Sequence, residues 1–160
     1  MTAKKIATIA LLSFTILAIG VILMKGRAPE PPTDANGTES ESMLMQPDAN
    51  IDVVYYFMTT QRCPSCEKIE AYTSEAVRNT FAGMIADKKM MWKMVNVDEP
   101  ENAHFVRDYG LFTKSVVVVR YREGRQYDWK NLDQVWMLLN DKAAFQDYVV
   151  REITAFVGEG

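Results

Sequence analysis

A chain of 160 residues with 48% hydrophobic and 24% charged side chains has room for one globular domain and a short appendage. Its 18 Lys and Arg against 21 Asp and Glu give a formal net charge of −3. No basic stripe stands out in the sequence, so we expect no nucleic-acid partner. Only two cysteines are present, at positions 63 and 66, which concentrates any thiol chemistry in one place.

The first predicted element is an apolar segment near the N-terminus. Residues 6–24 carry no charge, and nineteen residues at a rise of about 1.5 Å span roughly 28 Å, close to the hydrocarbon thickness of a bilayer. No small-residue cleavage site stands out after the segment. We therefore predict a signal anchor, an uncleaved transmembrane helix over residues 1–25. A cleaved secretory signal is the main alternative, and a soluble helix is the next.

Positive charges flank this segment on both sides and set its expected orientation. Lys4, Lys5 and the terminal amine precede it, whereas Lys25 and Arg27 follow it. The more positive flank of a transmembrane helix stays in the cytoplasm. We therefore expect a single-pass membrane protein whose globular part is extracytoplasmic, on the periplasmic or cell-surface side.

Residues 26–50 are predicted to form a flexible linker. Proline, glycine, serine and acidic residues alternate there, and only Met43-Leu44-Met45 interrupts the polar composition. A flexible chain of this length has a mean reach of about 28 Å. The linker would hold the globular domain, residues 51–160, near the membrane and still let it turn.

The predicted globular domain alternates between β-prone and helical patterns. β-Branched and aromatic runs predict strands, and apolar residues three or four apart predict helices. The order favours a β-α-β unit, a hairpin and a closing helix in an α/β fold with one mixed sheet flanked by helices. The expected elements are a strand over 51–58, a helix over 64–86, a strand over 90–97, a short helix between Asp98 and Gly110, a strand through 116–119, a turn at Glu123-Gly124 into a strand ending near Trp129, a short helix over 132–139, and a final helix capped by Asp141.

The two cysteines lie between the first strand and the first helix, in Cys63-Pro64-Ser65-Cys66. Two thiols three positions apart at a helix start can close a disulfide by a small movement and reopen it through a mixed disulfide with a partner. Pro64 suits the first helical turn. Cys63 should lie at the helix N-terminus, where unpaired N–H groups stabilise a thiolate, and Arg62 adds a cation beside it. The alternative is a structural disulfide, but so short a loop would add little stability.

The order of elements, with this motif after the first strand, resembles the thioredoxin fold over nearly all of residues 51–160. The segments YYFMTTQRCPSC, VNVDEPEN, FTKSVVVV and WKNLDQVW also resemble small bacterial thioredoxin-like proteins that are labelled nitrophenyl-compound nitroreductase subunits of arsenic-resistance clusters. The resemblance implies that Cys63 is the exposed nucleophile and Cys66 the buried resolving thiol. No flavin or nicotinamide motif is present, so we expect no cofactor.

Two positions depart from the thioredoxin pattern. Most thioredoxins carry a cis-proline where this chain has Ser115, and there we expect a trans bond because a non-proline cis bond costs about 2.5–4 kcal/mol. Lys114 would then bring a second cation toward Cys63, although both residues could be ordinary loop residues. Residues 53–58 also lack the buried acid that many thioredoxins place on this strand. Deprotonation of Cys66 would then need water or another group.

We therefore expect a membrane-anchored thiol-disulfide oxidoreductase that exchanges the Cys63-Cys66 pair with a protein partner. It would act as a reductase fed by a membrane-embedded thiol carrier. The substrate could be an apocytochrome, a metal-handling protein or a neighbour in an arsenic-detoxification set.

The alternative is a non-enzymatic module, either a Cu(I)-binding chaperone or a structural subunit of a redox complex. The ten methionines favour Cu(I), which prefers soft sulfur, but methionine is mostly a core residue. A structural zinc site needs four ligands, and His104 is the only histidine, so we expect no metal site. Trp129 and Trp136 are expected to pack in the core, or else to dock a membrane partner.

Overall fold

The computed structural model describes residues 50–158. The predicted transmembrane helix over residues 1–25 and nearly all of the predicted linker lie outside them. Among the residues that the structure describes, no helix is both long and apolar enough to cross a membrane. The described elements are β1 (Ile51–Met58), α3 (Pro64–Thr80), α4 (Ala82–Ala86), β2 (Met90–Asn96), α5 (His104–Asp108), β3 (Ser115–Arg122), β4 (Arg125–Asn131), the 3-10 helix η1 (Asp133–Trp136) and α6 (Lys142–Gly158).

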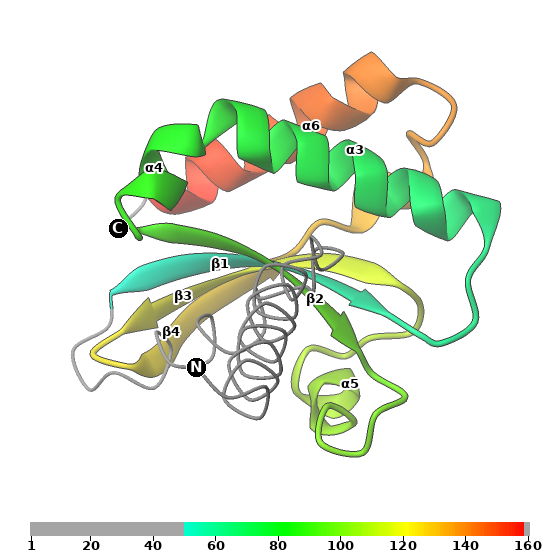
Figure 1. Cartoon of the computed structure of the whole chain (residues 1–160), viewed down its shortest axis with the longest axis horizontal. Helices are drawn as coiled ribbons and strands as arrows, with labels where there is room; N and C mark the ends of the chain where they lie inside the picture. The colour runs from blue at the N-terminus through cyan, green and yellow to red at the C-terminus, as the bar shows by residue number, and fades with distance from the viewer. Residues whose placement is uncertain (1–49, 159–160) are drawn as a thin grey trace, which may run out of the picture. The chain divides into compact units, whose positions relative to one another are not determined.

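The four strands form one mixed sheet in the order β2-β1-β3-β4 (Figure 1). β1 pairs in parallel with β2 and antiparallel with β3, and β3 pairs antiparallel with β4. This is the predicted β-α-β unit followed by a hairpin and a closing helix. A mixed sheet with this order, flanked by helices, fits the thioredoxin-like fold.

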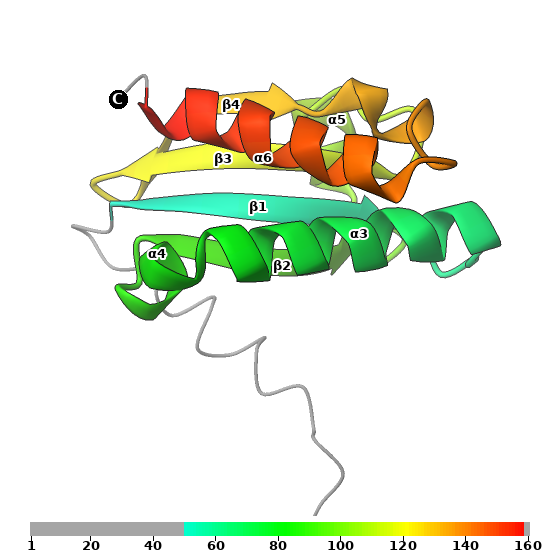
Figure 2. The same ribbon diagram turned by 90° about the horizontal axis from the view of Figure 1, so that it is seen from above.

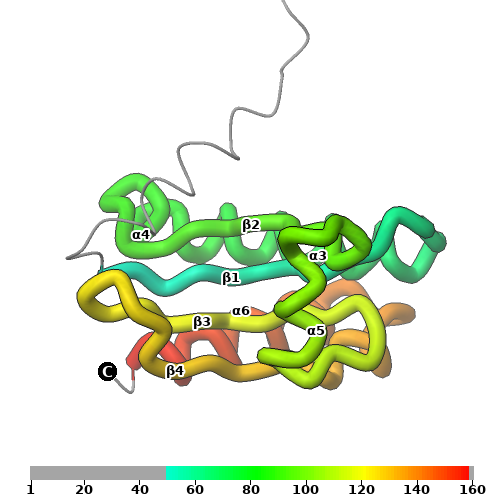
Figure 3. The backbone as a smooth tube through the Cα atoms, turned by 90° about the horizontal axis from the view of Figure 1, so that it is seen from below, coloured from blue at the N-terminus to red at the C-terminus, as the bar shows by residue number. Residues whose placement is uncertain are grey.

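The helices cover both faces of the sheet. α3, α4 and α6 lie on one face, where α3 and α6 run side by side (Figure 2), and α5 lies on the other (Figure 3). Because side chains alternate along a strand, Val54 and Tyr56 of β1 pack under α3 and α6, whereas Tyr55 and Phe57 pack toward α5. Both faces of β1 are therefore buried, which explains its apolar and aromatic run over residues 53–58.

Two expected helices differ from the structure. The helix predicted over 64–86 ends at Thr80, and the separate helix α4 follows the buried Phe81. The backbone of Phe81 leaves the helical region, with φ −106° and ψ 23°, so that its ring packs in the helix-side core. The helix predicted over 132–139 is only the four-residue η1, because the N–H of Leu132 is still bonded to the Val116 carbonyl of β3, at 2.8 Å.

Other local predictions are confirmed. Glu123 and Gly124 have φ values of 50° and 69°, the positive angles that a two-residue hairpin turn requires. The carboxylate of Asp141 accepts the N–H of Ala144 at 3.0 Å and so caps α6. α6 turns one face to the core, where its buried residues are Phe145, Tyr148, Val149, Ile153 and Phe156.

Candidate functional site

The cysteine turn begins where β1 ends and α3 starts. Cys63 is the N-cap of α3, with an extended backbone (φ −143°, ψ 155°), and Pro64 occupies the first helical turn as predicted. The Cys63 Sγ accepts the backbone N–H of Cys66 at 3.2 Å. An N-terminal N–H group and the positive end of α3 therefore point at this sulfur, which favours a thiolate there once the disulfide is reduced.

The two cysteines are joined by a disulfide, with their Cα atoms 5.0 Å apart. They differ in access to solvent. Cys63 is partly exposed, whereas Cys66 is only 1% exposed and belongs to the buried face of α3. Of the two sulfur atoms, a partner can therefore reach that of Cys63 and not that of Cys66.

Arg62 lies beside Cys63 in sequence, but its charge is balanced. Its Nη2 forms an ion pair with Glu70 on the second turn of α3, and its Nη1 donates to the Met58 Sδ at 2.7 Å. The hydrogen bond that Arg62 donates to the Glu70 carboxylate is the main cause that raises the pKa of Arg62. The cation predicted beside the thiol is therefore present as half of an ion pair, and Glu70 is a site residue that the sequence reasoning missed.

Tyr56 is a second missed residue. Its buried hydroxyl donates to the backbone carbonyl of Cys66 at 2.9 Å. Burial, with a smaller contribution from Glu70, raises its pKa to about 12, and the charge of Arg62 opposes this shift. The hydroxyl is therefore protonated at neutral pH and keeps its donor role. The strand alternation places Tyr56 under α3, but on sequence evidence alone it resembles any other core aromatic residue.

Lys114 and Ser115 lie at the start of β3, at the same end of the sheet as the cysteine turn. Ser115 pairs with Phe57 in the β1–β3 register, so the loop before Ser115 is next to the loop that follows β1. Ser115 is buried, and its Oγ donates to the Thr113 carbonyl at 2.9 Å. The Lys114 carbonyl accepts the indole N–H of Trp136 at 2.8 Å. No peptide bond in residues 50–158 is cis, in agreement with the trans bond expected here.

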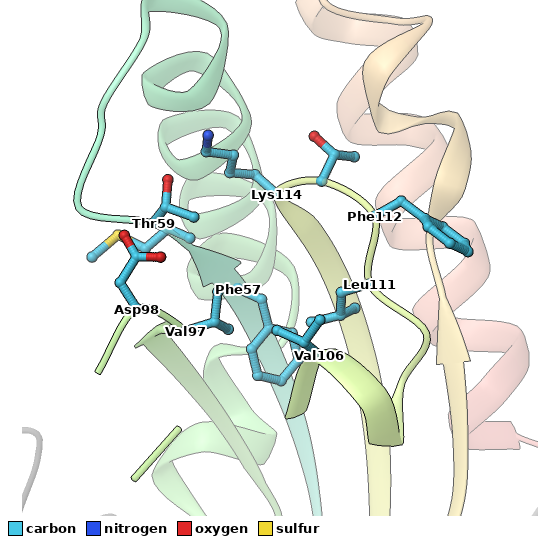
Figure 4. A pocket seen from close by; sticks show the side chains of 10 residues that line it. Phe57, Thr59, Val97, Asp98, Val106, Leu111, Phe112 and Lys114 are labelled. Carbon is cyan, nitrogen blue, oxygen red and sulfur yellow. The ribbon is translucent and has the colours of Figure 1, made fainter. Parts of the chain in front are cut away.

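A pocket of about 350 Å³ opens between these two loops and the end of β2 (Figure 4). Figure 4 shows Phe57, Val97, Val106 and Leu111 on its apolar side, and the polar ends of Thr59, Asp98 and Lys114 on the other. Asp98 also accepts the backbone N–H of Thr60 at 2.8 Å, which ties the cysteine loop to the end of β2. Phe112 lines the same pocket and is fully exposed. The chain thus offers an apolar surface at the end of the sheet where the cysteine loop leaves β1.

The remaining candidates do not gather into a site. Within residues 50–158 no group of three His, Cys, Asp or Glu side chains could hold a metal ion. His104 is exposed on α5, and its Nδ1 lies 2.8 Å from the Glu101 carbonyl oxygen. Trp129 packs edge-on against Tyr109 on the α5 face, whereas the half-buried Trp136 is bonded to the loop at Lys114. Met43 and Met45 lie outside the described residues.

Comparisons with known proteins identify no family. No protein-family model and no curated protein matches the chain. Among solved structures, thioredoxin O2 from Arabidopsis thaliana in its oxidized state is 16% identical, with a TM-score of 0.39 over 58% of this chain and 74% of that one. Thioredoxin-2, a component of the protein secretion machinery of the malaria parasite, is 16% identical, with a TM-score of 0.33 over 57% of this chain and 82% of that one. A further malarial protein is 15% identical, with a TM-score of 0.35 over 51% of this chain and 80% of that one. We therefore infer function from the geometry of the cysteine turn itself.

Proposed function

We propose that this protein is a thiol-disulfide oxidoreductase that exchanges its Cys63-Cys66 pair with a disulfide or dithiol of a partner protein. One observation carries the proposal. A partly exposed Cys63 caps the N-terminus of α3, accepts an N–H of that helix, and is joined to a buried Cys66. This arrangement combines an accessible sulfur, a backbone that stabilises its thiolate, and a second sulfur within bonding distance.

The exchange follows in two balanced steps. In the reduced protein, the Cys63 thiolate attacks one sulfur of a partner disulfide, which forms a mixed disulfide and releases the other partner sulfur as a thiolate. Cys66, after losing its proton to water or a nearby group, attacks the Cys63 Sγ and releases the second partner thiolate. The partner gains two electrons, and the Cys63-Cys66 disulfide forms. Recycling requires a dithiol donor that reverses these steps.

The chief alternative for the pair is a purely structural disulfide. A bridge between positions 63 and 66 closes a very short loop, so it constrains the unfolded chain little. A stabilising bridge would also gain nothing from a sulfur placed at a helix N-terminus, whereas a nucleophile would. The placement therefore favours exchange.

The proposal extends to the cellular setting. We place the protein in a membrane through its N-terminal segment, with residues 51–160 on the extracytoplasmic side, because of the uncharged segment over 6–24 and the positive residues before it. A thiol protein outside the cytoplasm needs a source of electrons, so a membrane-embedded thiol carrier completes the scheme for a reductase. The likeness to bacterial thioredoxin-like nitroreductase subunits belongs to the same proposal and rests on the sequence motifs.

The reduction potential of the Cys63-Cys66 pair tests this function. We would equilibrate the full-length protein, in detergent, with glutathione and dithiothreitol buffers and measure the fraction of dithiol. Cys63→Ser, which cannot form the bridge, provides the blank. A midpoint near −270 mV is expected of a reductase, and a midpoint near −120 mV would make the protein an oxidant instead. A disulfide that stays closed below about −300 mV would identify a structural bridge and contradict the proposal.

A further inference from the structure

The charges nearest to the cysteine turn form a closed pair. Arg62, immediately before Cys63, is bonded to Glu70, and the side chains of both are about one-third exposed, at 33% and 27%. Glu70 is four residues after Cys66 and seven after Cys63, so all three share one face of α3. The second guanidinium nitrogen of Arg62 donates to Met58 at the end of β1, which fixes the direction of the side chain.

The pair also lies close to the buried side of the turn. The hydroxyl of Tyr56, which bonds the Cys66 carbonyl, is affected by both charges, Arg62 favouring its ionised form and Glu70 opposing it. The two charges act in opposite directions on this hydroxyl. Because Arg62 and Glu70 form an ion pair, their charges also oppose each other at Cys63, which is covalently next to Arg62.

We propose that Glu70 is a positioning residue that sets the reduction potential of the Cys63-Cys66 pair by balancing the charge of Arg62. The inference rests on the proposed function. Reduction by two electrons and one proton gives a Cys63 thiolate and a Cys66 thiol. A net positive charge beside Cys63 stabilises this reduced form, and a net negative charge opposes it. With the ion pair intact, the potential reflects mainly the helix N-terminus.

Other charges near the turn are constant in the experiment. Glu67 lies in the first turn of α3, and Lys114 and Asp98 come from the loops at the same end of the sheet. None of them is hydrogen-bonded to Arg62 or Glu70 in the described structure, and the charge of Glu67, which also acts on Arg62, is the same in every variant. Substitutions of Arg62 and Glu70 therefore change only the net charge of this ion pair.

The test compares the disulfide–dithiol equilibrium of the full-length protein against glutathione at pH 7 in four forms: wild type, Glu70→Gln, Arg62→Gln and the double variant. Glu70→Gln leaves Arg62 unbalanced, so we expect the equilibrium to move toward the dithiol by about threefold to tenfold. Arg62→Gln leaves the Glu70 carboxylate unbalanced, so we expect a shift of similar size toward the disulfide. The double variant should lie within about twofold of wild type, as expected for coupled residues.

Matched controls separate charge from structure. Glu75→Gln makes the same change on the same helix and breaks the ion pair with Lys142, but Glu75 lies about 18 Å along α3 from Cys63, against about 10 Å for Glu70. It should leave the equilibrium unchanged. Arg62→Lys keeps the positive charge, so its disulfide–dithiol equilibrium should stay near that of wild type. Circular dichroism checks that each variant is folded.

The possible outcomes distinguish the inference from the function on which it rests. If the wild-type pair equilibrates with glutathione but the two single variants move it in the same direction, or Glu75→Gln moves it equally, Glu70 does not set the potential. Shifts below twofold in both single variants would overturn the inference in the same way. If the wild-type disulfide does not exchange with thiols at all, the proposed function is wrong, and this inference is wrong with it.

Discussion

At the scale of single residues, the buried hydroxyl of Tyr56 ties the central strand to the cysteine turn. It donates to the Cys66 carbonyl at 2.9 Å from a side chain that is fully buried. A hydrogen bond of this kind contributes about 0.5–1.5 kcal/mol to stability, and leaving a buried partner unpaired costs about 1–3 kcal/mol. Tyr56 therefore stabilises the fold and holds the resolving cysteine in place.

Tyr56→Phe should lower the free energy of unfolding by about 1–2 kcal/mol at pH 7 because the Cys66 carbonyl loses this donor.

Wild type should also lose stability as the pH rises from 10 to 12. The tyrosine of the unfolded chain releases its proton near pH 10, whereas burial raises the pKa of the folded one to about 12. The stability that this shift contributes is therefore complete below pH 10 and is lost as the pH rises to 12.

Urea denaturation at pH 7 and at pH 11 checks both expectations. The variant should lose less stability than wild type between the two pH values. Tyr127→Phe, which removes a hydroxyl from a residue that is 75% exposed, is the matched control and should behave as wild type. An equal alkaline loss in wild type and Tyr56→Phe would show that this hydroxyl does not contribute to the pH dependence.

The site residues differ in how far the sequence could reveal them. Cys63, Pro64 and Cys66 act through local geometry, namely a helix start after a strand, so their placement in α3 was predictable. Tyr56 and Glu70 act through contacts between β1, the cysteine loop and α3. Those contacts exist only after the strand and helix have packed, and no local pattern distinguishes either residue from an ordinary core aromatic or surface acid.

At the scale of the elements, one buried arginine joins two strands and the last helix. Arg120 of β3 donates through Nε to Asp52 of β1 at 3.0 Å, and through Nη2 to the carbonyls of Phe156 and Val157 at 2.7 and 3.0 Å. These carbonyls belong to the last turn of α6, where no following helical N–H group is available to donate to them. Arg120 therefore supplies hydrogen-bond donors both to two carbonyls at the C-terminus of α6 and to the buried carboxylate of Asp52.

Arg120→Met should destabilise the protein by about 3–5 kcal/mol because it leaves Asp52 buried with only Arg122, whose Nη1 is 3.7 Å away. The Asp52→Asn/Arg120→Met double variant should lose less than the sum of the single variants, since it removes both charges. Urea denaturation measures each free energy. A loss below 1 kcal/mol in Arg120→Met would mean that this contact network does not hold α6 to the sheet.

Element boundaries were predictable where a local signal sets them. β1 is marked by its apolar and aromatic run, the β3–β4 turn by Glu123-Gly124, and the start of α6 by Asp141. The break after Thr80 and the shortness of η1 were not predictable. The first depends on the burial of Phe81 in the core, and the second on the hydrogen bond from Leu132 to β3.

At the scale of the whole molecule, the folded domain follows a proposed membrane anchor in the chain. The exposed Phe112, the 350 Å³ pocket and the partly exposed Cys63 all lie at the end of the sheet where β1 ends and β3 begins. A partner that reaches Cys63 therefore approaches the end of the sheet that also carries this apolar surface. The anchor, proposed from residues 1–25, would confine this encounter to the membrane surface.

Trapping of a mixed disulfide is the decisive test of thiol-disulfide exchange at Cys63. Cys66→Ser removes the resolving sulfur, so the Cys63–partner bond should persist. Cells producing the full-length variant would be quenched in acid, alkylated and fractionated, and the membranes analysed with and without dithiothreitol. We predict an adduct of higher mass in the membrane fraction that dithiothreitol releases and that is absent from Cys63→Ser. The absence of an adduct from Cys66→Ser, or an equal adduct in Cys63→Ser, would contradict the account.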